Sequence, residues 1–274
     1  MDTLEQLMRR TIFRYYTRNH KSRQNLVDRM TEQTTRNIYE LNQFVNLTHQ
    51  DSRTLNALYG RFVHSTLRAL DSGRPLESLK ENLSSIASSH SSLLRHFLLT
   101  IHDSGLIDSD QNHPIACIEY SPALQLRLLG VPVSDIQEPI LDIGCGREGR
   151  LVHQLREWGY EAYGVDRNVM DHPYLLQSDW SAFRWQRETW GTVISHMAFS
   201  NHFNHHHLRK NGQPEVYARI FMDMLQALKK SGSFYYAPGL PFMEELLPTG
   251  KYRIARIQDD MQKEFYSTQI IRLD

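Results

Sequence analysis

A glycine-rich turn between a short apolar run and a helical pattern constrains the fold of this chain more than any other feature. Residues 141–150 read LDIGCGREGR. The turn follows a strand expected at residues 139–143 and opens a helix expected at residues 150–159. Its glycines let the backbone turn tightly and leave no Cβ between the backbone and a ligand. The segment predicts a ligand-binding turn at the carboxyl end of a strand.

From residue 138 onward, short apolar runs alternate with helical patterns. Further strands are expected at residues 161–165, 174–176, 192–195 and 233–237, and a long helix at residues 214–230. Alternation of this kind produces crossover units and a parallel sheet. Two final apolar runs, 252–257 and 268–273, have no helix-length segment between them. They predict an antiparallel hairpin at the edge of the sheet.

The first hundred residues have helical periodicity instead. One stripe of apolar side chains at helical spacing comprises Leu55, Leu58, Phe62, Leu67 and Leu70. The polar segment 102–112, HDSGLIDSDQN, is expected to be a linker or loop. We therefore expect a helical domain over residues 1–115 and an α/β domain over residues 116–274.

Composition narrows the class of partner. Lys plus Arg and Asp plus Glu both number 31, so the formal net charge is zero. Proteins that bind nucleic acid or anionic membranes usually carry a basic surplus, so we expect neither partner. The first residues, MDTLEQLMRRT, lack the basic-then-apolar order of a signal peptide, and two cysteines, Cys117 and Cys145, cannot form a disulfide framework. A cytoplasmic protein is expected.

An acidic residue in the turn decides between two kinds of ligand. Gly144, Gly146 and Gly149 satisfy the G-x-G-x-x-G pattern of dinucleotide-binding folds. However, Asp142 stands two residues before the first glycine, where its carboxylate would repel a pyrophosphate on the turn. S-adenosylmethionine (SAM) has no phosphate and carries an ammonium and a sulfonium. Asp142 therefore favours SAM as the ligand.

Two more acids follow the next two expected strands. Asp166 ends the run EAYGVD, where a carboxylate can accept hydrogen bonds from both ribose hydroxyls. Asp179 follows the next strand and could accept from the adenine amino group, while Trp180 or a neighbour covers the ring. Three acids after three successive strands form a much more specific signal than one glycine loop.

Residues 138–274 resemble a class I (Rossmann-like) SAM-dependent methyltransferase. The resemblance rests on Asp142-x-Gly144-x-Gly146, on Asp166, on the pair Ser178-Asp179, on the helix at 214–230 with the following LKKSG, and on the terminal hairpin. It implies a seven-stranded, mostly parallel sheet with helices on both faces and the last strand antiparallel. The helical domain would precede this sheet. SAM would lie across the ends of the first two strands.

The expected cofactor contacts all lie in the second half of the chain. They are Asp142, Gly144, Cys145, Gly146, Asp166, Arg167, Ser178, Asp179, Trp180 and Ser195. We interpret Cys145 as a small filler in the loop, not as a nucleophile, because no basic partner for its thiol is evident.

A histidine-rich segment follows the fourth strand, where the family places the transferred methyl. Residues 194–208 read ISHMAFSNHFNHHHL, without the Asn-Pro-Pro-aromatic motif of nucleobase and amide N-methyltransferases. His202 could serve as a general base, and His202, His205, His206 and His207 could bind a metal, although no carboxylate is nearby. Alternatively the segment is a polar loop without chemistry. We assign catalytic roles to His202, as base, and His196, near SAM, and expect no metal.

The expected function is in-line methyl transfer from SAM to a small-molecule acceptor. Three alternatives remain at this point: a peptide or protein acceptor, a non-catalytic SAM-fold binding module, and an NAD(P)-dependent oxidoreductase. The last would need an apolar residue in place of Asp142, and no Tyr-x-x-x-Lys pair occurs. The helical domain is expected to form a lid or wall of the acceptor site, or to make a homodimer.

Overall fold

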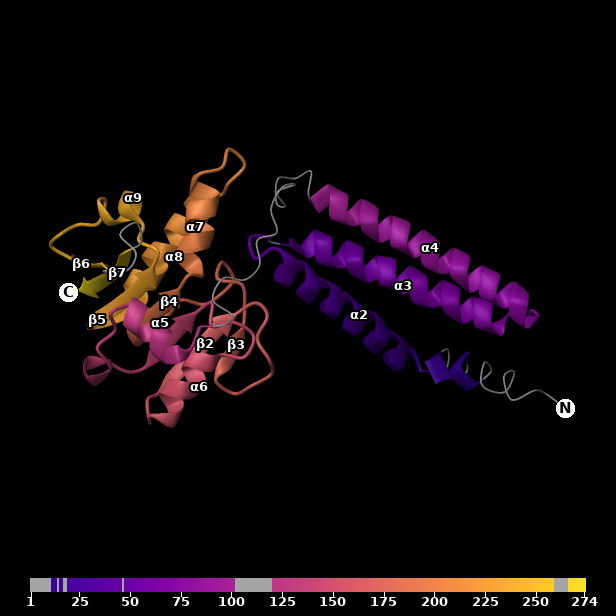
Figure 1. The fold of residues 1–274 in the computed structure, drawn as a ribbon, viewed down its shortest axis with the longest axis horizontal. Coiled ribbons are helices and arrows are strands. Elements are labelled where there is room, and N and C mark those ends of the chain that lie inside the picture. The colour runs from indigo at the N-terminus through magenta and orange to yellow at the C-terminus, as the bar shows by residue number, and fades with distance from the viewer. Residues whose placement is uncertain (1–10, 14, 17–18, 46, 102–119, 259–265) are drawn as a thin grey trace. The chain divides into compact units, whose positions relative to one another are not determined.

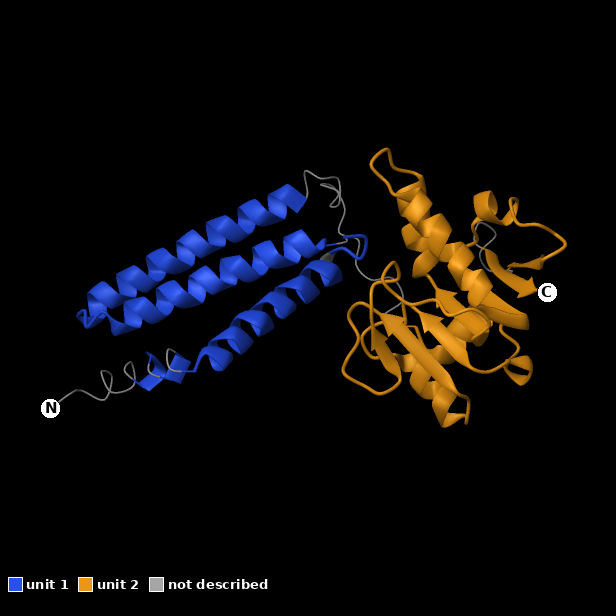
Figure 2. Cartoon of the chain, turned by 180° about the vertical axis from the view of Figure 1, so that it is seen from behind, with its two compact units in different colours: residues 1–115 blue, residues 116–274 orange. Residues whose placement is uncertain are grey.

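The chain divides into two compact units, residues 1–115 and residues 116–274 (Figure 2). A computed structural model describes residues 11–13, 15–16, 19–45, 47–101, 120–258 and 266–274. The predicted linker at 102–112 and Cys117 lie outside the described residues. Each unit has a hydrophobic core of its own.

Unit 1 is helical, as its periodicity predicts. It contains α2 (His20–Leu41), α3 (His49–Asp71) and α4 (Leu76–Ile101), which pack along one another (Figure 1). A capping box begins α3: the Thr48 hydroxyl accepts from the Asp51 amide at 3.1 Å, and the Thr48 amide donates to the Asp51 carboxylate at 2.8 Å. Leu55, Leu58 and Leu67 of the predicted stripe are buried in this core.

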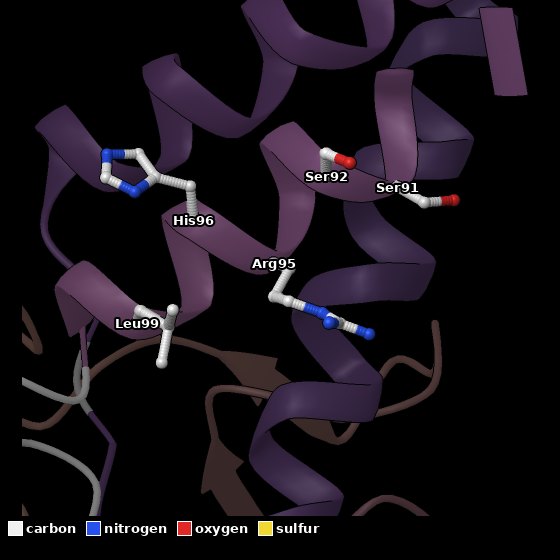
Figure 3. A pocket seen from close by; sticks show the side chains of 5 residues that line it. All are labelled: Ser91, Ser92, Arg95, His96 and Leu99. Carbon is white, nitrogen blue, oxygen red and sulfur yellow. The ribbon is translucent and has the colours of Figure 1, made fainter. Parts of the chain in front are cut away.

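A shallow hollow lies on the exposed side of α4. It measures about 290 Å³ and is lined by Ser91, Ser92, Arg95, His96 and Leu99 (Figure 3). All five residues belong to one helix, and the side chains of Arg95 and His96 point apart. The hollow therefore gathers no set of converging polar groups.

Unit 2 is built on a seven-stranded sheet with the order β3-β2-β1-β4-β5-β7-β6. The strands are β1 (Ile140–Ile143), β2 (Ala162–Asp166), β3 (Leu175–Gln177), β4 (Trp190–His196), β5 (Leu228–Ala237), β6 (Tyr252–Gln258) and β7 (Tyr266–Arg272). The first five are parallel, and β7 runs antiparallel to both β5 and β6. The predicted α/β class, the mostly parallel sheet and the terminal hairpin are confirmed.

Helices cover both faces of the sheet. They are α5 (Pro122–Leu128), α6 (Arg150–Glu157), α7 (Phe199–His207), α8 (Pro214–Ala227) and the short α9 (Pro241–Glu244). Successive strand residues point to opposite faces, so Val193 packs with the core of α7 and α8, and Ile194 with the core of α5 and α6. The helices on both faces that the resemblance implies are thus present.

Candidate functional site

The glycine loop after β1 is closely packed on one side and open on the other. Gly144 has a φ of +74°, and a Cβ there would lie 2.3 Å from the Cβ of Ala198. Gly146 has a φ of +71°, but a Cβ there would lie within 4 Å of no described residue. The loop therefore contacts the β4–α7 corner at Gly144 and leaves open space beside Gly146.

Cys145 fills a space beneath this loop. A Cβ on Gly164 of β2 would lie 2.6 Å from the Cys145 sulfur, so glycine at 164 makes room for the thiol. Burial, and then the carboxylates of Asp142 and Asp166, raise the pKa of the thiol well above its ordinary value. The thiol stays protonated at neutral pH, which agrees with a packing role and not with a nucleophile.

Asp142 is a buried acid inside β1. Only 4% of the residue is exposed, and within the described residues its carboxylate has no hydrogen bond or ion pair. Burial and then the neighbouring Asp166 raise the pKa of Asp142 to about 7. A buried carboxylate without a partner is stabilised by a bound cation.

Asp166 connects the end of β2 to the glycine loop. Its carboxylate accepts from the amide of Asn168 at 2.9 Å through Oδ1 and from the amide of Gly146 at 3.2 Å through Oδ2. Burial raises the pKa of Asp166. The hydrogen bond from the Asn168 amide stabilises the ionised carboxylate and is the largest of the contributions that lower this pKa. These contacts hold an acceptor-rich side chain beside the loop.

Asp179 and Trp180 follow β3. Asp179 is exposed, and its Oδ1 accepts from both the amide and the hydroxyl of Ser181, at 2.8 and 2.5 Å. The carboxylate thus caps a turn, while Oδ2 makes no hydrogen bond with any described residue. The indole of Trp180 lies against the loop, since a Cβ on Gly144 would be 3.3 Å from its Cζ2.

Three further residues predicted to contact the cofactor differ in their surroundings: Ser178, Arg167 and Ser195. The Ser178 amide donates to the Asp166 carbonyl at 3.1 Å and joins the ends of β2 and β3. The charge of Arg167 opposes the rise that burial causes in the pKa of Asp166, and it adds to the fall that burial causes in the pKa of His202. Ser195 is fully buried, and its hydroxyl donates to the Ile143 carbonyl at 3.0 Å and accepts from the Phe199 amide at 3.1 Å. Its hydroxyl therefore fastens β4 to β1 and to the start of α7.

The histidine-rich segment is not a loop: most of it forms α7, so the polar-loop interpretation is wrong. Phe199 and Phe203, at positions i and i+4, are buried in the core with α8. The surrounding histidines hid this amphipathic pattern in the sequence. They also join the aromatic packing, because His206 stacks on Tyr217 with centroids 4.6 Å apart and His207 stacks on Phe242 at 3.8 Å.

His202 lies inside that aromatic layer. It is buried, its ring is 5.0 Å from that of Trp180, and its Nδ1 lies 3.5 Å from the Tyr217 hydroxyl. Burial, followed by the charge of Arg167, holds the pKa of His202 well below its ordinary value, so the ring is neutral at physiological pH. Among the described residues, no group of three or more His, Cys, Asp or Glu side chains could hold a metal ion.

His196 ends β4 and contacts a residue that the sequence did not single out. Burial lowers the pKa of His196 to about 4, and its Nδ1 has no hydrogen-bond partner in the described part of the chain. The ring of Tyr120 lies 5.5 Å away at an interplanar angle of 47°. Tyr120 directly precedes the N-cap Ser121 of α5, and no local pattern marked it as a site residue.

No protein-family model and no curated protein sequence matches this chain. Solved structures of methyltransferases are similar. The glycopeptide N-methyltransferase MtfA, complexed with S-adenosylhomocysteine (SAH), is 13% identical with a TM-score of 0.39, over 62% of this chain and 97% of that chain. The Burkholderia thailandensis 1,6-didemethyltoxoflavin-N1-methyltransferase is 17% identical with a TM-score of 0.37, over 68% and 90%.

The sheet itself matches what the resemblance implies. Five parallel strands are followed by a hairpin whose last strand, β7, is antiparallel, and a glycine loop follows β1. In the described part of the chain no helix combines the length and the hydropathy that crossing a bilayer requires. Residues 116–274 thus have the seven-stranded, mostly parallel sheet with helices on both faces that the resemblance to class I SAM-dependent methyltransferases implies.

Proposed function

We propose that this chain is a SAM-dependent methyltransferase that acts on a small-molecule acceptor. The observation that carries the proposal is the buried carboxylate of Asp142, which pairs with no described residue, beside a glycine loop where the described chain leaves room at Gly146. A cationic ligand would stabilise the ionised form of this acid, whereas a pyrophosphate would be repelled by it. The second acid, Asp166, is tied to the same loop through the Gly146 amide.

Each cofactor residue has a role that its surroundings support. Asp142 would attract the ammonium of SAM, and Asp166 would accept from the ribose hydroxyls with the lone pairs that its two amide donors leave over. Trp180, which packs on the loop, would cover the adenine, and Oδ2 of Asp179 would accept from the adenine amino group. Arg167 and Ser178 would shape the site, and the buried Ser195 would support it from beneath.

Catalysis in such a site depends chiefly on alignment. SAM supplies both the methyl group and its leaving group: the bond from carbon to sulfur breaks as the bond to the acceptor forms, S-adenosylhomocysteine leaves, and the proton of an O–H or N–H acceptor passes to solvent. The protein's task is to hold the acceptor in line with that bond and to exclude water, which can lower the barrier by about 7–11 kcal/mol. The helical unit 1 would serve as a lid or wall for the acceptor.

The two histidines proposed as catalytic differ in their surroundings. His202 packs between aromatic rings and has a hydrogen-bond partner in Tyr217, and its protonated form is disfavoured by burial. We therefore propose that His202 supports the wall near Trp180 instead of acting as a general base. We propose that His196, at the carboxyl end of β4, contacts the acceptor.

Substitution of Asp166 tests the proposal. Asp166→Ala should weaken SAH binding by about 1.5–3 kcal/mol, the contribution of hydrogen bonds to a charged group. Asp171→Ala, which removes an exposed carboxylate from the same β2–β3 connection, is the matched control and should leave the affinity unchanged. Isothermal titration calorimetry measures both. Equal SAH affinity in wild type and Asp166→Ala would contradict the assignment of the ribose site.

A further inference from the structure

The imidazole of His196 is a polar group without a polar partner. Only 8% of the residue is exposed, and its buried Nδ1 is hydrogen-bonded to no described residue. A neutral imidazole carries one donor and one acceptor nitrogen, and leaving such groups buried and unpaired is unfavourable. Native structures retain unsatisfied polar groups mainly where a ligand, a water or a catalytic role accounts for them.

The backbone next to His196 is held in an uncommon conformation. Met197 has a φ of +54°, a region that side chains other than glycine rarely adopt. Two hydrogen bonds fix it there: the Met197 amide donates to the Ala237 carbonyl at 2.8 Å, and the Asn201 side chain donates to the Met197 carbonyl at 2.8 Å. Residues held in this way cluster at ligand sites, where the backbone must direct a particular side chain.

The corner that carries His196 adjoins the glycine loop. Ala198, two residues further on, occupies the space where a Cβ of Gly144 would be, at 2.3 Å. On the other side, His196 pairs in register with Ala237 at the end of β5. In open parallel sheets, ligands bind outside the carboxyl ends of the strands. The unpaired imidazole therefore lies at the ligand-binding edge, next to the loop assigned to SAM.

Tyr120 supplies an aromatic surface against this imidazole. Its ring is 5.5 Å from that of His196, 38% of the residue is exposed, and its hydroxyl has no hydrogen bond within the described residues. Burial lowers the pKa of His196, and the described ring that packs against its imidazole is the aromatic ring of Tyr120. A neutral imidazole beside an aromatic surface suits an uncharged aromatic molecule better than an ion.

We propose that His196 and Tyr120 form the acceptor subsite: His196 hydrogen-bonds an O–H or N–H group of an uncharged aromatic acceptor, and Tyr120 packs against the acceptor's ring. This assignment rests on the proposed methyltransferase function. It names the substrate class, an aromatic alcohol or an aromatic N–H compound, and it makes Tyr120 a determinant of specificity.

Binding of phenol to the SAH-loaded full-length protein tests the subsite, with toluene as the matched probe that lacks the hydroxyl. Phenol should bind about threefold to tenfold more tightly than toluene, the difference expected for one neutral hydrogen bond. Titration with phenol should also shift the side-chain ¹⁵N resonances of His196. Equal affinity for the two probes, or an unmoved His196 signal, would overturn the proposal.

Three variants separate recognition from packing. His196→Phe keeps a ring against Tyr120 and should abolish the preference for phenol. Tyr120→Ala should lower the affinity for both phenol and toluene by about tenfold. Leu208→Ala, which truncates an exposed side chain at the end of α7, is the control and should match wild type. All three should keep SAH affinity within about threefold of wild type. A phenol preference that survives in His196→Phe would contradict the subsite.

Failure of the subsite can be told from failure of the proposed function. Wild-type protein that binds SAH but does not distinguish phenol from toluene would refute the subsite alone. Wild-type protein that does not bind SAH at all would refute the methyltransferase function on which the subsite rests.

Discussion

Ionisation of Asp142 lowers the stability of the unliganded protein but favours the proposed binding of SAM. The pKa of this buried acid is about 7 in the folded chain, against an ordinary value of 3.8. Between these values the folded state binds more protons than the unfolded state, so the free energy of unfolding falls as the pH rises through this range. Above pH 7 the carboxylate is ionised and destabilising until a cation neutralises it.

Asp142→Asn should therefore have opposite effects on stability and binding. At pH 8 it should raise the free energy of unfolding of the unliganded protein by at least about 1 kcal/mol, since one pKa unit corresponds to about 1.4 kcal/mol. SAH affinity should fall at least about tenfold, because the charge opposite the ammonium is lost. Urea unfolding and calorimetry measure the two effects. A variant that is less stable and binds SAH normally would contradict this role for Asp142.

At the scale of elements, the strands and the glycine loop could be predicted because their signals are local. The run at 139–143 and the loop after it carry their pattern within ten residues of sequence. The sequence around α7 does not reveal the helix, because the burial of His202 and His206 depends on contacts with Tyr217 of α8. The contact of Tyr120 with His196 joins residues far apart in the chain, so periodicity alone could not reveal it.

The burial of His202 in α7 predicts that the protein loses stability in acid. The pKa of His202 is held well below its ordinary value, so below about pH 6.5 the unfolded state gains a proton that the folded state does not. Stability therefore falls as the pH drops. His202→Phe should reduce the loss of unfolding free energy between pH 8 and pH 5 by about 1–2 kcal/mol.

His207→Phe is the matched control for this measurement. His207 is exposed on the same helix and already stacks on Phe242, so a phenylalanine there keeps the ring contact. Urea unfolding at the two pH values should show wild-type pH dependence for this variant. If His202→Phe also retained the wild-type pH dependence, the neutral, buried state assigned to His202 would be wrong.

At the scale of the whole molecule, we propose that unit 2 binds SAM and that unit 1 serves the acceptor. Every residue assigned to SAM lies in unit 2, which has its own sheet and core, and unit 1 has a separate helical core. A protein comprising residues 116–274 should keep SAH affinity within about threefold of the full chain and lose methyl transfer. Calorimetry and a radiolabelled methyl-transfer assay measure the two properties. Full transfer activity in a folded, truncated protein would refute the lid proposal.

The central claim is that the loop at residues 144–146 holds SAM and not a dinucleotide. Calorimetric titration of the full-length protein with SAM, SAH and NAD(H) tests it most directly. Because Asp142 favours a cation and repels a pyrophosphate, SAM and SAH should bind in the micromolar range, and NAD(H) should give no saturable heat. Saturable binding of NAD(H) without binding of SAM or SAH would contradict the account.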